Sequence, residues 1–328
     1  MKIVFINGNG FDINLKLKTR YTDFYNYYKS IETKSKPVLE LKNSIANNIE
    51  NWADLELALG EYSEKIKNEE EFIEIFEDIG DNLADYLQHE ESKFDINKID
   101  KQKLFDYLSF PENSLTNAQK ESIEKIRTKW KGHHWYINII TFNYTKTIEK
   151  ILEKKEPHLV IGTQNKAQVL YQGIEHIHGF MDNRMVMGVN DISQIKNKTF
   201  HNKKEVLDAF VKNNCNLAMQ HTVDEICKKQ LNEANLICVF GSSLGETDKM
   251  WWEIIGNRLL SECNIIIFER RASIPERRAY KKDAIRIEIK ESFLSKTNLT
   301  TEEKEQVFDK IFVGINTEMF SGIQKTTR

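Results

Sequence analysis

Residues 2 to 12 have the sequence KIVFINGNGFD, a short apolar run that ends in a turn with two glycines. Three later segments repeat this plan of an apolar run followed by small or polar residues. Runs this short and rich in β-branched residues are typical of buried parallel strands. An open α/β sheet binds its ligand beyond the carboxyl ends of its strands, so these endings are the predicted site. The four runs are 2–6, 136–140, 236–240 and 264–268.

Strand and helix patterns alternate in the second half of the chain, which implies crossover connections between parallel strands. We therefore predict an α/β fold, with a Rossmann-like, doubly wound, mostly parallel sheet. Residues 1–32 and 132–328 are expected to form a Rossmann-type nucleotide-binding domain. The further elements predicted there are strands near 160, 174 and 284–287, and helices from 145, over 205–231, 248–260 and 274–280, and from 301.

A large helical block interrupts the predicted sheet over residues 33–131. Apolar residues recur at helical spacing within it, most clearly over 72–87. Between Glu50 and Asp100 the chain has 17 acidic residues and 4 basic ones. Charge runs on helices usually form a solvated face, and a docking surface for a basic partner or a neighbouring subunit is the functional alternative. We predict an inserted acidic cap or interaction subdomain.

Composition argues against several classes of function. The formal net charge of -3 gives no general attraction to nucleic acid. The four cysteines contain no Cys-x-x-Cys pair and sit in apolar patterns, as expected of free thiols in a reducing compartment. No apolar run reaches membrane-spanning length, and the first run is too short for a signal peptide. We expect a cytoplasmic protein that binds neither nucleic acid nor membrane.

The first strand ending has the features of a phosphate-binding loop. Gly8 and Gly10 flank Asn9 directly after the run, and Phe11 and Asp12 follow. Glycines at these places let backbone amides approach a diphosphate closely. The third glycine of the dinucleotide motif is absent, and a purely structural turn is the alternative. We predict these five residues as cofactor-binding.

Two further strand endings also carry polar and small residues. Thr141 and Asn143 follow the second run, and an asparagine offers both a donor and an acceptor to a ribose or a water. Asparagine is also common in ordinary turns, which is the structural alternative. Gly241, Ser242 and Ser243 follow the third run and suit a second phosphate- or ribose-binding turn. All five are predicted to contact the ligand.

Two histidines lie two residues apart in Glu175-His176-Ile177-His178-Gly179, and in a strand they would share a face. Such a pair can bind zinc, but no further ligands follow at a recognisable spacing, so we expect no metal. A histidine satisfied within the core is the structural alternative. Gly179 permits close approach of the backbone to a ligand, so we predict His178 as a general base near neutral pH.

Two further motifs lie between the first loop and the second strand ending, namely Thr19-x-Tyr21-x-x-Phe24 and Trp52-x-Asp54-Leu55-Glu56. Taken in order, all these segments resemble the AbiH abortive-infection family of bacterial anti-phage proteins. The resemblance extends from residue 4 to about residue 250. That family is in turn similar to sirtuin-type nucleotide-binding proteins, several of which hydrolyse NAD in phage defence. The motifs that carry the resemblance are Gly-Asn-Gly-Phe-Asp, Thr19-x-Tyr21-x-x-Phe24, Trp52-x-Asp54-Leu55-Glu56, Thr-Phe-Asn-Tyr-Thr, His-x-His-Gly and Gly-x-Ser-Leu-Gly.

The sirtuin-type resemblance implies roles for individual residues. Gly8 and Gly10 would hold the phosphates, while Asn143 would position a water and the ribose hydroxyls. His178 would accept a proton, and Ser243 with its neighbours would lie at the adenosine side. NAD is then the implied substrate, hydrolysis of its nicotinamide–ribose bond is the implied reaction, and no metal takes part.

Two residues depart from the sirtuin-type pattern. Thr145 stands where aspartate is usual, and Asp12 replaces a small residue in the loop. The zinc module of protein deacylases is also missing, which argues against a deacylase. The alternatives to an NAD hydrolase are a nucleotide-binding sensor without turnover and a self-associating scaffold. A phage-derived trigger and a homo-oligomer fit an effector that must be held inactive until infection.

Overall fold

A computed structural model describes residues 1–153 and 158–325, and seven strands form one sheet in them, in the order β3-β4-β2-β1-β5-β6-β7. All neighbouring strands are parallel except β3 and β4, which are antiparallel. The predicted α/β class and mostly parallel sheet are thereby confirmed, while the finer Rossmann-like, doubly wound assignment stays a prediction. The strands are β1 (Lys2–Asn7), β2 (Trp135–Thr141), β3 (Leu159–Gln164), β4 (Ala167–His176), β5 (Leu236–Phe240), β6 (Asn264–Glu269) and β7 (Ile311–Ile315).

The carboxyl ends of the central strands are aligned. In the register of β1 with its two neighbours, Asn7 pairs with Thr141 of β2 and with Phe240 of β5. The strands themselves form because their β-branched and aromatic side chains are buried on both faces, as every residue of β5 is. The loops after β1, β2 and β5 therefore begin side by side at one edge of the sheet.

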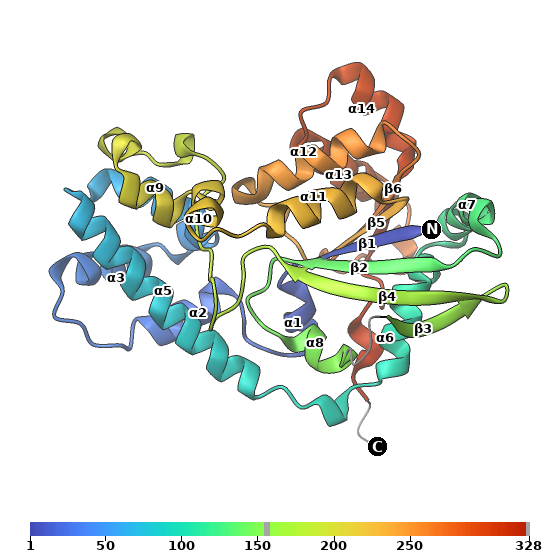
Figure 1. The fold of residues 1–328 in the computed structure, drawn as a ribbon, viewed down its shortest axis with the longest axis horizontal. Helices are drawn as coiled ribbons and strands as arrows, with labels where there is room; N and C mark the ends of the chain where they lie inside the picture. The colour runs from blue at the N-terminus through green and yellow to red at the C-terminus, as the bar shows by residue number, and fades with distance from the viewer. Residues whose placement is uncertain (154–157, 326–328) are drawn as a thin grey trace.

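Helices cover both faces of the sheet (Figure 1). One face packs on α1 (Gly10–Asn14), α6 (Lys101–Ser109), α7 (Asn117–Arg127) and α8 (Thr147–Leu152), through one hydrophobic cluster. The other face packs on α11 (Val223–Glu233), α12 (Lys249–Leu259), α13 (Lys281–Ser295) and α14 (Thr301–Val307), through a second cluster.

A third hydrophobic cluster belongs to helices beyond the sheet, which we call the helical lobe. The carboxyl ends of the parallel strands face this lobe (Figure 1). α6 and α7 lie in the range predicted as a cap but pack on the sheet, and α9 lies outside that range but packs in the lobe. The domain boundaries drawn from the sequence stay a prediction. The lobe consists of α2 (Tyr21–Tyr28), α3 (Lys36–Asn47), α4 (Leu55–Tyr62), α5 (Glu69–Ser92) and α9 (Lys204–Phe210).

Two predicted elements near the C-terminus differ from the structure, and one strand there was not predicted. Residues 284–287 lie in helix α13 rather than in a strand, because the longer apolar spacing of Ile285, Ile289 and Phe293 is helical and buries that face. Residues 274–280 form only the short 3-10 helix η9 (Glu276–Arg278). Strand β7 was not predicted, although its apolar residues pair in parallel with β6.

The four cysteines are free and buried, as their apolar surroundings in the sequence predict. Burial raises the pKa of Cys215 to about 11, so that thiol stays protonated at neutral pH. Within the described residues, no helix has both the length and the apolar character required to cross a membrane.

Candidate functional site

A cavity of about 380 Å³ lies where the strand endings meet the helical lobe. The lobe contributes Tyr21, Asp54, Glu56 and Leu83 to its wall. Residues that are up to 240 positions apart in the chain therefore share one concave surface. The residues predicted from the sequence that line it are Gly8, Asn9, Asp12, Asn143, His178, Gly241, Ser242 and Ser243.

Three other predicted residues lie elsewhere. Gly10 lines an adjoining cavity of about 440 Å³, which shares the 241–243 turn with the first. Phe11 is buried in the core against the ring of Phe320. Thr141 is buried at the end of β2, where its hydroxyl donates to the carbonyl of Asn7 at 3.0 Å. Phe11 and Thr141 are therefore buried beneath the loops that line the cavity and do not line it themselves.

The glycines of the first loop allow two loops to touch. A Cβ on Gly10 would lie 2.4 Å from Cα of Gly241, and one on Gly8 would lie 2.5 Å from its carbonyl oxygen. Gly241 itself has φ +68°, a conformation that favours glycine. The amides of Gly8 and Gly10 donate to Phe240 O and Gly241 O at 2.9 and 3.0 Å. These two amides are therefore engaged within the fold, and the cofactor-binding role of Gly8 and Gly10 stays a prediction.

Asn143 presents an unsatisfied amide to the cavity. The residue is 6% exposed, and among the described residues neither its Oδ1 nor its Nδ2 has a hydrogen-bond partner. Its backbone is held on both sides, because its N–H donates to Thr141 Oγ1 at 3.1 Å and its carbonyl accepts from His176 Nδ1 at 2.8 Å. A buried amide without a partner costs about 1–3 kcal/mol, which a hydrogen-bonding ligand would offset. Thr19 Oγ1, also in the wall, is equally unpartnered in the described chain.

The two histidines serve different partners. β4 ends at His176, so strand alternation does not extend to His178. The ring of His176 bridges the Asn143 carbonyl and the carboxylate of Glu149, and it is buried. The ring of His178 stacks on Phe142, with centroids 5.4 Å apart, and its Nε2 lies 3.1 Å from Asp248 Oδ1.

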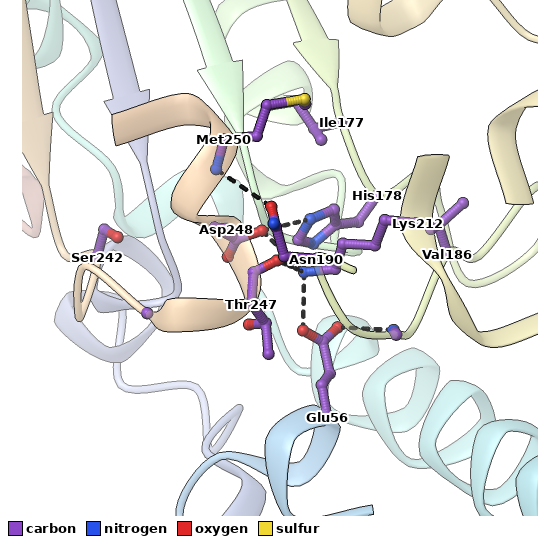
Figure 2. Close-up of polar contacts among 12 residues, drawn as sticks. Glu56, Ile177, His178, Val186, Asn190, Lys212, Ser242, Thr247, Asp248 and Met250 are labelled. Atoms are coloured by element: carbon purple, nitrogen blue, oxygen red, sulfur yellow. Dashed lines mark hydrogen bonds and ion pairs between the residues drawn. The ribbon is translucent and has the colours of Figure 1, made fainter. Parts of the chain in front are cut away.

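The contact between His178 and Asp248 orients the imidazole and selects its tautomer (Figure 2). Burial alone would raise the pKa of Asp248, but Lys212 and His178 outweigh it and hold that pKa well below its ordinary range. An ionised carboxylate only accepts, so His178 Nε2 carries the hydrogen and a neutral ring keeps its lone pair on Nδ1. Within the described residues Nδ1 has no hydrogen-bond partner. The arrangement is that of a carboxylate-oriented base.

Asp248 is also bound to Lys212, which links it to the lobe. Asp248 follows the Gly241 turn and precedes α12, where a helix cap is expected, but its side chain caps nothing. Lys212 Nζ instead lies 2.8 Å from Asp248 Oδ1 and 2.8 Å from Glu56 Oε2 (Figure 2). Burial lowers the pKa of Lys212, yet the two carboxylates raise it above its ordinary value. The ammonium therefore stays charged inside the protein.

Asp12 and Thr145, the two residues singled out as departures in the sequence, contact each other. Asp12 accepts hydrogen bonds from the hydroxyls of Thr145 and Thr147, both at 2.6 Å. Asp12 and Thr145, which both line the first cavity, are thus hydrogen-bonded to each other. Burial raises the pKa of Asp12 from 3.8 to about 6, although both hydroxyls act in the opposite direction.

The raised pKa of Asp12 predicts a pH-dependent stability. The folded state binds more protons than the unfolded state between pH 4 and 6, so stability falls as pH rises through this window. A shift of about two units corresponds to about 3 kcal/mol. We expect the free energy of unfolding of Asp12→Asn in urea not to show this fall. The free energy of unfolding of the wild type should therefore decrease relative to that of Asp12→Asn between pH 4 and 7. Identical pH profiles would exclude a buried, ionising Asp12.

Sequence reasoning missed several residues of the wall. Arg20 lines both cavities, is exposed and forms no ion pair within the described chain. Asp54 caps α4 by accepting from Leu57 N at 3.1 Å, and burial together with Glu56 raises its pKa to about 6. Asp54 and Glu56 belong to the Trp-x-Asp-Leu-Glu motif. Lys212, which does not line the cavity, belongs to no motif in the sequence. The described residues contain no group of three histidine, cysteine or acidic side chains placed to hold a metal.

Comparison with known proteins identifies a family for most of the chain. A family model described as "Bacteriophage abortive infection AbiH" matches residues 4–269. All residues in the wall of the first cavity fall inside the matched range. No curated protein and no solved structure matched the chain.

Proposed function

Because this chain belongs to the AbiH family of bacteriophage abortive infection, we propose that it serves that response by hydrolysing NAD at the nicotinamide–ribose bond. The sirtuin-type likeness of its strand endings supports NAD as the ligand. The site lies where nucleotides bind in parallel α/β sheets, beyond the carboxyl ends of the strands. Loss of NAD would halt metabolism in an infected cell, which suits an abortive response.

The unpartnered amide of Asn143 carries the proposal. A buried side chain that offers both a donor and an acceptor to a cavity is suited to a ribose hydroxyl and a water together. The fixed backbone of Asn143 places that amide in the same cavity as the His178 ring. Asn143 thus positions the water and the ribose hydroxyls, and His178 is the proton acceptor.

The reaction needs only NAD and water, and its bonds balance without a metal. The bond between C1′ of the ribose and the nicotinamide nitrogen breaks, and its electron pair neutralises the pyridinium. A water oxygen bonds to C1′, and its proton passes to His178 Nδ1 and then to solvent. The transition state resembles an oxocarbenium ion, which the carboxylates of Asp54 and Glu56 in the cavity wall stabilise electrostatically.

We place the diphosphate on a partner other than the amides of Gly8 and Gly10. The amides of Gly8 and Gly10 are engaged with the β5 loop, so they do not serve it. Arg20 borders both cavities beside the 241–243 turn and forms no ion pair in the described structure. An arginine suits a diphosphate because its planar fork binds two oxygens at once. We assign Arg20 this role.

The products of an incubation with NAD test the proposal, because each bond broken leaves a different pair. We expect purified protein to release nicotinamide and ADP-ribose in equal amounts on chromatography. Nicotinamide mononucleotide with AMP would instead show cleavage of the diphosphate, and reduced NAD would show a dehydrogenase. Stoichiometric binding of intact NAD would favour the sensor. Any of these three results would overturn the proposed reaction.

A further inference from the structure

Lys212 occupies a junction between the site and the helical lobe. It begins α10 (Lys212–Ala218), and its backbone N–H donates to Val189 O at 3.0 Å. Its three ammonium protons have three acceptors, which are Asp248 Oδ1 at 2.8 Å, Thr247 O at 3.0 Å and Glu56 Oε2 at 2.8 Å. Each hydrogen of the Lys212 ammonium therefore has an acceptor, and the side chain is held in one position.

Glu56 fixes the lobe end of this chain of contacts. It lies in α4, is 4% exposed, and its Oε1 accepts from Gly188 N at 3.3 Å. Figure 2 shows Glu56 below Lys212, with Asp248 and His178 above. Glu56, Lys212 and Asp248 thus form one buried row of charges that begins in the lobe, and the ring of His178 binds the Asp248 end of it.

The arrangement couples its members strongly. His178 Nε2 and Lys212 Nζ both bind the same oxygen, Asp248 Oδ1, so the position of that carboxylate fixes the imidazole. Removing one partner from a buried ion pair leaves an uncompensated charge, which is far more costly than the loss of a surface pair. Loss of the ion pair between Glu56 and Lys212 would therefore change the position of the His178 ring, although Glu56 does not contact that ring.

We propose that Lys212 is a positioning residue that fixes the His178 imidazole through Asp248, and that Glu56 makes this positioning depend on the docked helical lobe. The inference rests on the proposed function for its biological meaning, but ligand-free protein tests it.

The test is ring ¹⁵N NMR of His178, assigned with His178→Gln. In the wild type we expect the tautomer with hydrogen on Nε2. Lys212→Met is expected to shift the ring resonances, and Lys212→Arg to restore them, because arginine keeps the charge and the donors. Glu56→Gln is expected to shift them in the same direction by less. Lys204→Met, which removes an exposed lysine paired with Asp208, should change nothing.

The outcomes separate this inference from the proposed reaction. Unchanged His178 resonances in Lys212→Met would overturn the positioning role, and unchanged resonances in Glu56→Gln would overturn the link to the lobe. Should Lys212→Met not fold, the double variant with Glu56→Gln removes the second uncompensated carboxylate, and the same shift is expected. If the variants show these shifts but the wild type leaves NAD intact, the proposed reaction is refuted and the positioning role of Lys212 stands.

Discussion

His178→Ala is expected to lower the turnover number for NAD by about 10²–10⁴-fold, the usual contribution of a positioned general base. The substitution removes the Nδ1 lone pair that accepts the proton of the attacking water. It leaves the cavity wall otherwise intact, so the KM should change much less than the turnover number. Steady-state nicotinamide release measures both parameters.

A matched histidine variant controls for this result. His158 is exposed and does not line the cavity, so His158→Ala should retain wild-type turnover. A His178→Ala protein with wild-type turnover would remove the base from the mechanism. A large rise in KM at constant turnover would reassign His178 to substrate binding.

Gly241→Ala is expected to destabilise the fold by about 2–6 kcal/mol, the sum of strain at positive φ and of backbone overpacking. The new Cβ would lie 2.6 Å from Cα of Gly10, and neither backbone can yield without opening the junction of the β1 and β5 loops. Gly10→Ala creates the reciprocal overlap, with its Cβ 2.4 Å from Cα of Gly241, but Gly10 does not have a positive φ. That variant should therefore lose only the overpacking contribution, about 1–3 kcal/mol. Urea denaturation gives the free energies of unfolding.

Gly132→Ala separates the two contributions. Gly132 also has a positive φ, +81°, but nothing lies within 4 Å of its Cβ position. This variant should lose only the strain contribution, about 1–2 kcal/mol. Equal losses at Gly132 and Gly241 would show that the close contact of the two loops contributes nothing.

The position of the site was predictable because its main signals are local. Apolar runs with turn residues at their ends define parallel strands, and parallel strands carry their endings to one edge. The sequence alone therefore places Gly8, Asn143 and Gly241 together. It does not assign the roles of the glycines, since close packing and phosphate binding select the same residue.

The buried row of charges was not predictable for a physical reason. Lys212, Asp248 and Glu56 come from three elements that approach only through tertiary packing, and no spacing relates them. Aspartate before a helix usually caps it, so nothing in the sequence around Asp248 indicates that its side chain binds Lys212 and His178 instead. At residues 284–287, a short alternating pattern was outweighed by the longer helical spacing that ends at Phe293.

Nicotinamide release from NAD by three proteins measured together tests the central claim most directly. We expect the wild type to release nicotinamide, and Asn143→Ala to lose at least about tenfold in rate, since a lost hydrogen bond of about 1.4 kcal/mol in the transition state gives that factor. Asn26→Ala, which alters an exposed asparagine on α2, should match the wild type. No release by the wild type, or equal release by Asn143→Ala, would contradict the account.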